Sequence, residues 1–281
     1  MKLFAQQLGG ELRKLFARKR TYIGFGAFLV LECMVLFLLH LPKAKKAISQ
    51  IINSAGYDPS EYFSGLTLGL IIVMSTVFLL GALYLALVCG DVVSKEVEDG
   101  TMRMMLCRPV SRGRILLLKA VACVIYSGVL TFFISITALL AGSLYGGFGG
   151  LFVLAPLDHI FALYDFWPGL ERYLMAIPLL WLSLCTVSAI AFFFSCTKMK
   201  PAAATILTLS VLFLDTVLKG IPFFESYHDW FLTSKMGAWT HIFEYNVPWE
   251  GMIENYALLG AINLTLLLIG WQIFEQRDFK S

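Results

Sequence analysis

Long apolar stretches alternate with short polar connections along the chain. Six stretches reach roughly the 17–25 residues that an α-helix needs to cross a bilayer. They cover residues 22–41, 64–90, 115–145, 173–197, 202–218 and 256–274. The second and third are longer than a span requires, which predicts tilt or extension beyond the bilayer. None shows the period-2 alternation of barrel strands, so we expect six transmembrane helices.

The composition supports a membrane protein. The chain has 281 residues, of which 58% are hydrophobic and 15% are charged. Its mean hydropathy is +0.76, and ordinary soluble domains contain about 45–50% apolar and 25% charged residues. No stretch outside the apolar segments is long enough to bury a soluble core. We therefore expect an all-α integral membrane protein with one transmembrane domain over residues 1–281.

The distribution of basic residues predicts the orientation of the chain. Cytoplasmic loops of membrane proteins carry an excess of Lys and Arg. If the N-terminus is cytoplasmic, all of the 22 Lys and Arg residues but six fall on the cytoplasmic side, the exceptions being Lys43, Lys45, Lys46, Arg172, Lys219 and Lys235. We expect a multi-pass protein with both termini in the cytoplasm, in a bacterial inner membrane.

Residues 1–20 have the pattern of an amphipathic helix. Leu8, Leu12 and Leu15 recur at helical spacing, whereas Glu11 and Lys14 fall elsewhere around the axis. Such a helix lies in the membrane interface, with its basic residues towards the lipid headgroups. It is either an ordinary anchor or a helix that also helps to seat a cytoplasmic partner.

The connection over residues 219–255 is the longest on the outer side and is rich in aromatic residues. Aromatic side chains favour the headgroup level of a bilayer. We expect short interfacial or re-entrant helices there, forming either an aromatic belt or a lid over a substrate exit.

The most polar interruption of the apolar pattern covers residues 91–114. A helix continuing from the second span is expected to end at Gly100, since glycine often follows a helix terminus. Thr101 is a candidate N-cap for a short helix over residues 102–107. Pro109 is expected to end that helix.

The same segment leads into the third span. Ser111 is a candidate cap for this span, and Arg112, Arg114 and Lys119 are expected at the cytoplasmic headgroups. A solvated loop does not need such a series of helix-ending and capping residues. We therefore expect an ordered helix–turn–helix element that contacts a soluble partner.

These residues resemble a known family. The sequence Glu96-x-x-x-Gly100-Thr101, followed by Leu106-x-x-Pro109-Val110-Ser111-Arg112 and later Lys119, is similar to the cytoplasmic loop of type-2 ABC (ATP-binding cassette) transporter permeases. The layout of an amphipathic N-terminal helix and six spans is also similar. Cys107-Arg108 departs from the small residues that are usual before this proline.

The resemblance implies a two-component exporter. A separate ABC ATPase subunit would bind ATP and Mg²⁺, because this chain has no G-x-x-x-x-G-K-[ST] motif. Two permease copies, as a homodimer in the lipid bilayer, would pair with two ATPases. The short helix would be a coupling helix, a rigid lever that docks on the ATPase.

The residues of the coupling segment then receive individual roles. Met102, Met105 and Leu106 would provide apolar docking, and Glu96 and Arg103 would make polar contacts or brace the loop. Gly100 and Pro109 would transmit motion of the short helix to the spans. Thr101 would cap the short helix, and Arg112 would anchor the loop.

Two acidic residues fall within predicted spans. Glu32 lies near the middle of the first span, and Asp215 lies in the outer half of the fifth. An ionisable group within a span costs about 2.5–3.5 kcal/mol and usually faces protein or a water-filled cavity. Each carboxyl is either a structural group that hydrogen-bonds to a neighbouring span or part of a substrate path at a dimer interface.

Other functions receive less support from the sequence. A non-transporting membrane scaffold could use the same polar segment, and an intramembrane enzyme would need an acid–base pair that the spans lack. We expect no catalytic residue, no cofactor and no metal site in this chain. Basic residues are not interleaved with aromatic ones on one surface, so we expect no nucleic-acid partner.

Overall fold

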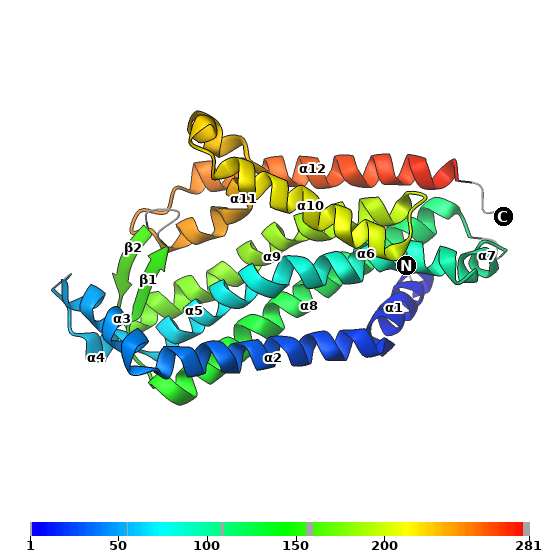
Figure 1. The fold of residues 1–281 in the computed structure, drawn as a ribbon. Helices are drawn as coiled ribbons and strands as arrows, with labels where there is room; N and C mark the ends of the chain where they lie inside the picture. Colours follow the sequence, from blue (N-terminus) through cyan, green and yellow to red (C-terminus); the bar gives the residue numbers. More distant parts are fainter. Residues whose placement is uncertain (1, 55, 108–109, 156–159, 278–281) are drawn as a thin grey trace.

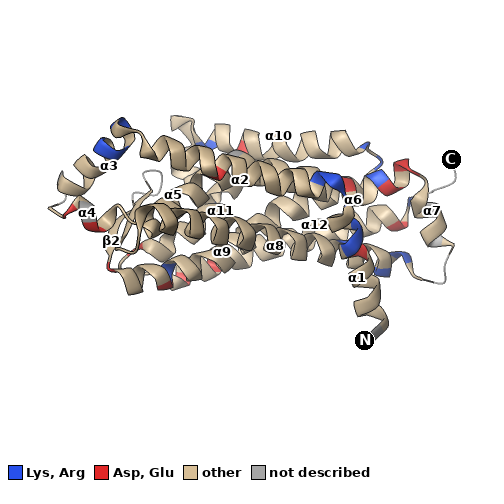
Figure 2. Cartoon of the chain, turned by 90° about the horizontal axis from the view of Figure 1, so that it is seen from below, with Lys and Arg blue, Asp and Glu red and all other residues tan. Residues whose placement is uncertain are grey.

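The chain forms an elongated bundle of helices (Figure 1). The computed structural model describes residues 2–54, 56–107, 110–155 and 160–277. Helix α1 (Lys2–Ala17), helix α7 (Thr101–Leu106) and both termini lie at one end, which we call the α7 end. Helices α3 (Pro42–Ser54) and α4 (Pro59–Tyr62) lie at the opposite end. Figure 2 shows that most charged residues lie near these two ends, as expected if the middle sits in hydrocarbon.

Five helices in the described residues are long and apolar enough to cross a membrane. They are α2 (Lys19–His40), α8 (Arg112–Gly146), α9 (Phe166–Cys196), α10 (Pro201–Lys219) and α12 (Trp249–Glu275). The remaining predicted span consists of three consecutive helical pieces, α5 (Gly65–Thr76), the π-helical turn η1 (Val77–Gly81) and α6 (Ala82–Glu98). The sequence pattern did not predict this π turn, because one extra residue per turn leaves the apolar run unchanged.

Helices α8 and α9 form the centre of the bundle. Within their most apolar windows, 61% and 56% of the residues are buried, against 22% for α2 and 17% each for α10 and α12. The three outer helices therefore present apolar side chains to the surroundings, as helices in contact with lipid or another membrane chain do.

Helices α5 and α8 pack with their backbones close together. A Cβ atom added at Gly65 would lie 2.5 Å from the Cα of Ser143, and one added at Gly146 would lie 2.8 Å from the backbone nitrogen of Gly65. Small residues at helix interfaces allow this approach in membrane proteins. The second and third spans, which flank the 91–114 segment, are thus joined as a tightly packed pair.

A β-hairpin at the end opposite α7 was not predicted. Strand β1 (Leu151–Ala155) pairs antiparallel with β2 (Ile160–Tyr164), with Leu151 opposite Tyr164. The two strands are short and almost uniformly apolar, and periodicity cannot distinguish such runs from buried helix. The backbone N–H of Phe152 donates to Thr67 Oγ1 (2.8 Å), which ties the hairpin to α5.

The aromatic segment over residues 219–255 forms the short helices that the sequence predicted. They are η3 (Pro222–Trp230), α11 (Leu232–Met236) and η4 (Gly237–Phe243). The side chains of Phe223 and Trp230 are exposed, whereas Phe243 is buried. Arg172 of α9 donates to the carbonyl oxygen of Glu244 (2.6 Å). The first half of the segment is thus suited to a headgroup belt, and the second half is fixed to the bundle.

Candidate functional site

The 91–114 segment folds as a helix, a turn and a second short helix. Helix α6 ends at Glu98, and Gly100 has a φ of +70°, the left-handed conformation that glycine adopts readily. Helix α7 follows directly, and α8 begins at Arg112. Two predicted features of the turn, Arg108 and Pro109, lie outside the described residues.

The two predicted caps in this segment differ from expectation, Thr101 in its position and Ser111 in its hydrogen bond. Thr101 is the first residue of α7 rather than its cap, and its hydroxyl donates to the carbonyl oxygen of Glu96 (3.2 Å). Ser111 occupies the N-cap position of α8, but its side chain makes no capping hydrogen bond. Thr101 instead fastens the start of α7 to the end of α6.

The methionines of α7 point in different directions. Met102 is fully buried in the core of the chain, and Met105 is partly buried against the same core. Met104 has 67% of its surface exposed. The structure does not describe the side chains of Arg103 and Leu106.

Met102 and Met105, which we expected to dock on a partner, face the permease itself in this structure. Among the described side chains of α7, the apolar one directed outward is Met104, to which the sequence assigned no role.

Glu96 belongs to a cluster of four charges, which we call the Lys119 cluster; Lys119 and Glu96 are buried, Glu11 is partly buried and Lys14 is exposed. Lys119 Nζ on α8 lies 2.8 Å from Glu96 Oε2 on α6 and 2.8 Å from Glu11 Oε2 on α1. Lys14 Nζ lies 2.7 Å from Glu11 Oε1 and 3.6 Å from Glu96 Oε1. The side chain of Lys119 is fully buried, so its charge depends on these two carboxylates. The cluster joins three helices directly beneath α7.

The expected position of Lys119 at the lipid headgroups is wrong. A sequence signal for the cluster does exist, because Lys119 is the only charged residue in the stretch 115–145 and Glu11 is the only acidic residue among residues 1–20. An isolated lysine in an apolar segment and an isolated glutamate in a basic segment are candidates for an ion pair with each other. Sequence alone does not show that the two segments meet.

The charges of the Lys119 cluster also determine the ionisation of Glu11. Burial alone would raise the pKa of the Glu11 carboxyl, but Lys119 and Lys14 outweigh this effect, and the pKa lies below its ordinary value of 4.5. Glu96 from α6 adds the remaining charge that faces the site. The ionised form of Glu11 is therefore favoured in the folded protein.

We expect the stabilisation by Glu11 to disappear in acid. A lowered carboxyl pKa contributes stability above the unfolded value of 4.5, and this contribution is lost as the pH falls through the folded-state pKa. The difference in unfolding temperature between the wild type and Glu11→Gln should stay constant between neutral pH and about pH 5 and shrink towards zero below it. Thermal scans of both proteins across this range measure it. A difference that does not change with pH would contradict the assigned role of Glu11.

Arg112 attaches the start of α8 to the end of α12. Its Nη1 donates to the carbonyl oxygens of Glu275 (2.9 Å), the last residue of α12, and of Arg277 (3.2 Å), just beyond it. Arg277 in turn donates to the carbonyl oxygen of Thr197 (2.9 Å), at the end of α9. These contacts connect three helix termini at the α7 end.

The two intramembrane carboxyls both have hydrogen-bond donors. Glu32 has only 2% of its surface exposed and accepts a hydrogen bond from the hydroxyl of Thr137 on α8 (2.9 Å). Asp215 accepts from the backbone N–H groups of Leu232 (3.1 Å) and Thr233 (2.7 Å), which holds α11 against α10. The Glu32 contact matches the expected bond to a neighbouring span, whereas the donors to Asp215 belong to the short helix α11 and not to a span. Neither contact tests the alternative of a substrate path.

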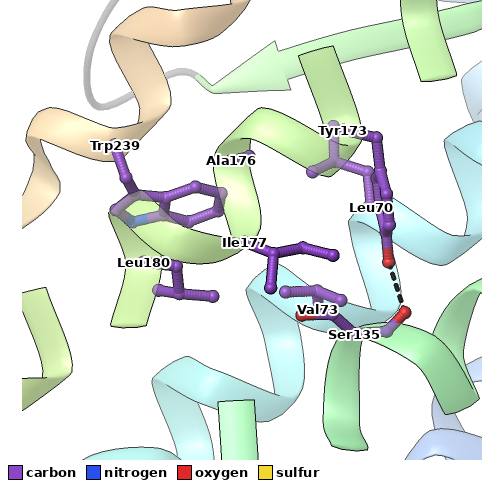
Figure 3. A pocket seen from close by; sticks show the side chains of 8 residues that line it. All are labelled: Leu70, Val73, Ser135, Tyr173, Ala176, Ile177, Leu180 and Trp239. Carbon is purple, nitrogen blue, oxygen red and sulfur yellow. Dashed lines mark hydrogen bonds between the residues drawn. The ribbon is translucent and has the colours of Figure 1, made fainter. Parts of the chain in front are cut away.

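One small apolar pocket lies between α5, α8, α9 and η4 (Figure 3). It encloses about 10 Å³, close to the space of one water molecule. The Tyr173 hydroxyl at its side donates to the carbonyl oxygen of Ser135 (2.7 Å). Among the described residues, no group of three or more His, Cys, Asp or Glu side chains could hold a metal ion.

Comparison with known proteins identifies the family. A search of curated proteins gives no match. The family description "ABC-2 family transporter protein" matches residues 8–215, about three quarters of the chain, from α1 through the 91–114 segment to the fifth predicted span. The matched region contains the resemblance noted at Glu96, Gly100 and Thr101. The chain belongs to the ABC-2 family of transporter proteins and is a multi-pass membrane permease subunit of an ABC transporter.

Proposed function

We propose that this permease is the membrane subunit of an exporter and that a separate ABC ATPase docks on α7. In this proposal the α7 end faces the cytoplasm, and two permease copies assemble with two ATPases in a bacterial inner membrane. ATP binding and hydrolysis, with the associated Mg²⁺, belong to the partner. The permease converts closure of the ATPases into movement of its spans.

The observation that supports this proposal most strongly is the position of α7. It lies at the extremity of the bundle, at the same end as α1 (Figure 1), and it presents Met104 outward. It is also joined to α6 by the hydrogen bond of Thr101 and by the short turn at Gly100. A force on α7 would thus reach α6 through this hydrogen bond and this short turn.

The packing of the spans supports transmission of that force. Helices α5 and α8 are in backbone contact near the far end of the bundle, and the Lys119 cluster joins α6 and α8 near α7. The second and third spans therefore move as one body. The apolar outer surfaces of α2, α10 and α12 are suited to contact with lipid and with a second copy.

A docking test follows from the exposure of Met104. The chain is co-expressed with a candidate ABC ATPase from the same organism, and the complex is purified and reconstituted in liposomes. Met104→Asp places a charge in the proposed apolar contact, so we expect stimulation of ATP hydrolysis by the permease to fall at least about tenfold. Insertion of the permease into the membrane should be unchanged.

Met199→Asp is the matched control for this substitution. Met199 is also exposed, at 36%, and lies in the turn between α9 and α10 near the same end. It should retain stimulation. Equal loss in both variants, or none in Met104→Asp, would contradict docking at α7. A permease that binds an ATPase without changing its hydrolysis rate would instead be a scaffold.

A further inference from the structure

Helix α1 is fixed to the protein in a manner that a lipid anchor does not require. Leu15 is 3% exposed, and Leu8, Leu12 and Phe16 are partly buried against the core of the bundle. The ring of Phe16 lies 5.5 Å from that of Tyr126 on α8. The apolar face of α1 is thus occupied by α8 and its neighbours, whereas an interfacial anchor would bury this face in lipid.

Two polar residues of α1, Glu11 and Lys14, also contact the protein. Glu11 is inserted between Lys119 and Lys14 within the Lys119 cluster. Lys14 Nζ lies 3.6 Å from the sulfur of Met105, which is a direct contact between α1 and α7. Helix α1 therefore contacts α6, α7 and α8 through one set of side chains.

A second attachment holds the corner between α1 and α2. Arg20 pairs with Asp91 of α6, whose side chain is almost fully buried. The hydroxyl of Tyr84, also on α6, donates to the carbonyl oxygen of Thr21 (2.9 Å). Within the corner itself, the Thr21 hydroxyl donates to the carbonyl oxygen of Leu15 (2.6 Å). Both the middle of α1 and its exit are thus attached to the helix that carries α7.

We propose that α1 is a positioning element for α7 and that Glu11 is its key positioning residue. Through Lys119 and Lys14, Glu11 holds the base of α7 at a fixed place on α6 and α8. Loss of the Glu11 charge releases α1 and lets α7 move relative to the spans, while the bundle stays folded. The consequence for ATPase coupling rests on the proposed function, but the effect on the position of α7 does not.

Two measurements on the permease alone, in lipid nanodiscs, test the positioning role. Amide hydrogen exchange reports on the 16-residue helix α1, and a nitroxide on Cys107 reports on the end of α7. Cys107 is exposed, and Cys33→Ser removes the other exposed cysteine from the described part of the chain. Glu11→Gln should speed exchange in α1 by about tenfold, which corresponds to about 1.4 kcal/mol of opening free energy, and should increase the mobility of the label.

Arg13→Gln is the matched control. It removes one charge from the same helix, but Arg13 is exposed and its side chain lies outside the Lys119 cluster. Exchange in α1 and mobility at Cys107 should both stay as in the wild type. If Glu11→Gln loosens α1 and leaves the Cys107 label unchanged, α1 is only an anchor and the inference is wrong. The same conclusion follows if neither readout changes, or if Arg13→Gln changes both equally.

A third measurement separates this inference from the proposed function. In the reconstituted complex with the ABC ATPase, the permease-stimulated rate of ATP hydrolysis should fall about tenfold in Glu11→Gln. It should stay at the wild-type rate in Arg13→Gln. If the wild-type permease stimulates no ATPase, the proposed function fails, and the inference is still judged by the Cys107 label. If stimulation is normal in Glu11→Gln although the label is mobile, the coupling role of α1 is refuted.

Discussion

Replacing Lys119 with methionine is expected to destabilise the permease more than any other single change at the α7 end. Methionine fills a similar volume but leaves Glu11 and Glu96 without the cation that lies 2.8 Å from each. Lys14, which is about half exposed, is then their only remaining partner in the cluster. Removing one member of a buried ion cluster costs about 3–5 kcal/mol. Reversible unfolding in mixed micelles measures the loss.

Replacing the three buried or partly buried members of the Lys119 cluster with apolar residues shows whether the loss of stability in Lys119→Met comes from unpaired carboxylates. In the triple variant Glu11→Leu, Glu96→Leu and Lys119→Met, no buried charge is left unpaired by the changes. Because well-packed apolar groups can replace a buried ion network with little loss or some gain, the triple variant should recover most of the stability lost by Lys119→Met. A triple variant as unstable as the single one would show that the cost comes from packing at residue 119 and not from the unpaired carboxylates.

Helix-ending residues in the sequence were sufficient to predict the break between α6 and α7. A positive φ is readily available to glycine, so the break at Gly100 follows from chain geometry without knowledge of any neighbour. The apolar length of the spans is set in the same way by the bilayer thickness. Both are properties that a short stretch of sequence carries by itself.

Contacts between distant segments could not be predicted in this way. The environment of Lys119 depends on Glu11, which is 108 positions away in the chain, and its charge alone favoured a position at the headgroups. Met102 and Met105 were expected to dock on a partner, and only the fold shows that the permease core covers Met102. The hairpin of β1 and β2 was missed because two five-residue apolar strands carry no distinctive period.

Substituting Gly142 with alanine is expected to separate the two spans that carry α7. An added Cβ would overlap the carbonyl oxygen of Gly65 and lie 2.9 Å from the backbone nitrogen of Gly69. Both obstacles are backbone atoms of α5, so no side-chain rotation can relieve them and the helices must move apart. Such overpacking costs about 1–3 kcal/mol, although alanine is by itself the better helix former by about 1 kcal/mol. Unfolding in mixed micelles gives the net change.

Gly260→Ala in α12 is the control that shows how replacing a helical glycine with alanine changes stability when no neighbour is in the way. No atom lies within 4 Å of a Cβ added at this position, once its chain neighbours and the local helix backbone are set aside. Alanine there should leave stability unchanged or increase it. If Gly142→Ala is as stable as Gly260→Ala, α5 and α8 are not in rigid contact, and motion of α7 would not reach both spans together. If Gly142→Ala is destabilised and also loses ATPase stimulation while Gly260→Ala retains both, the close packing of α5 on α8 is part of the path along which α7 acts.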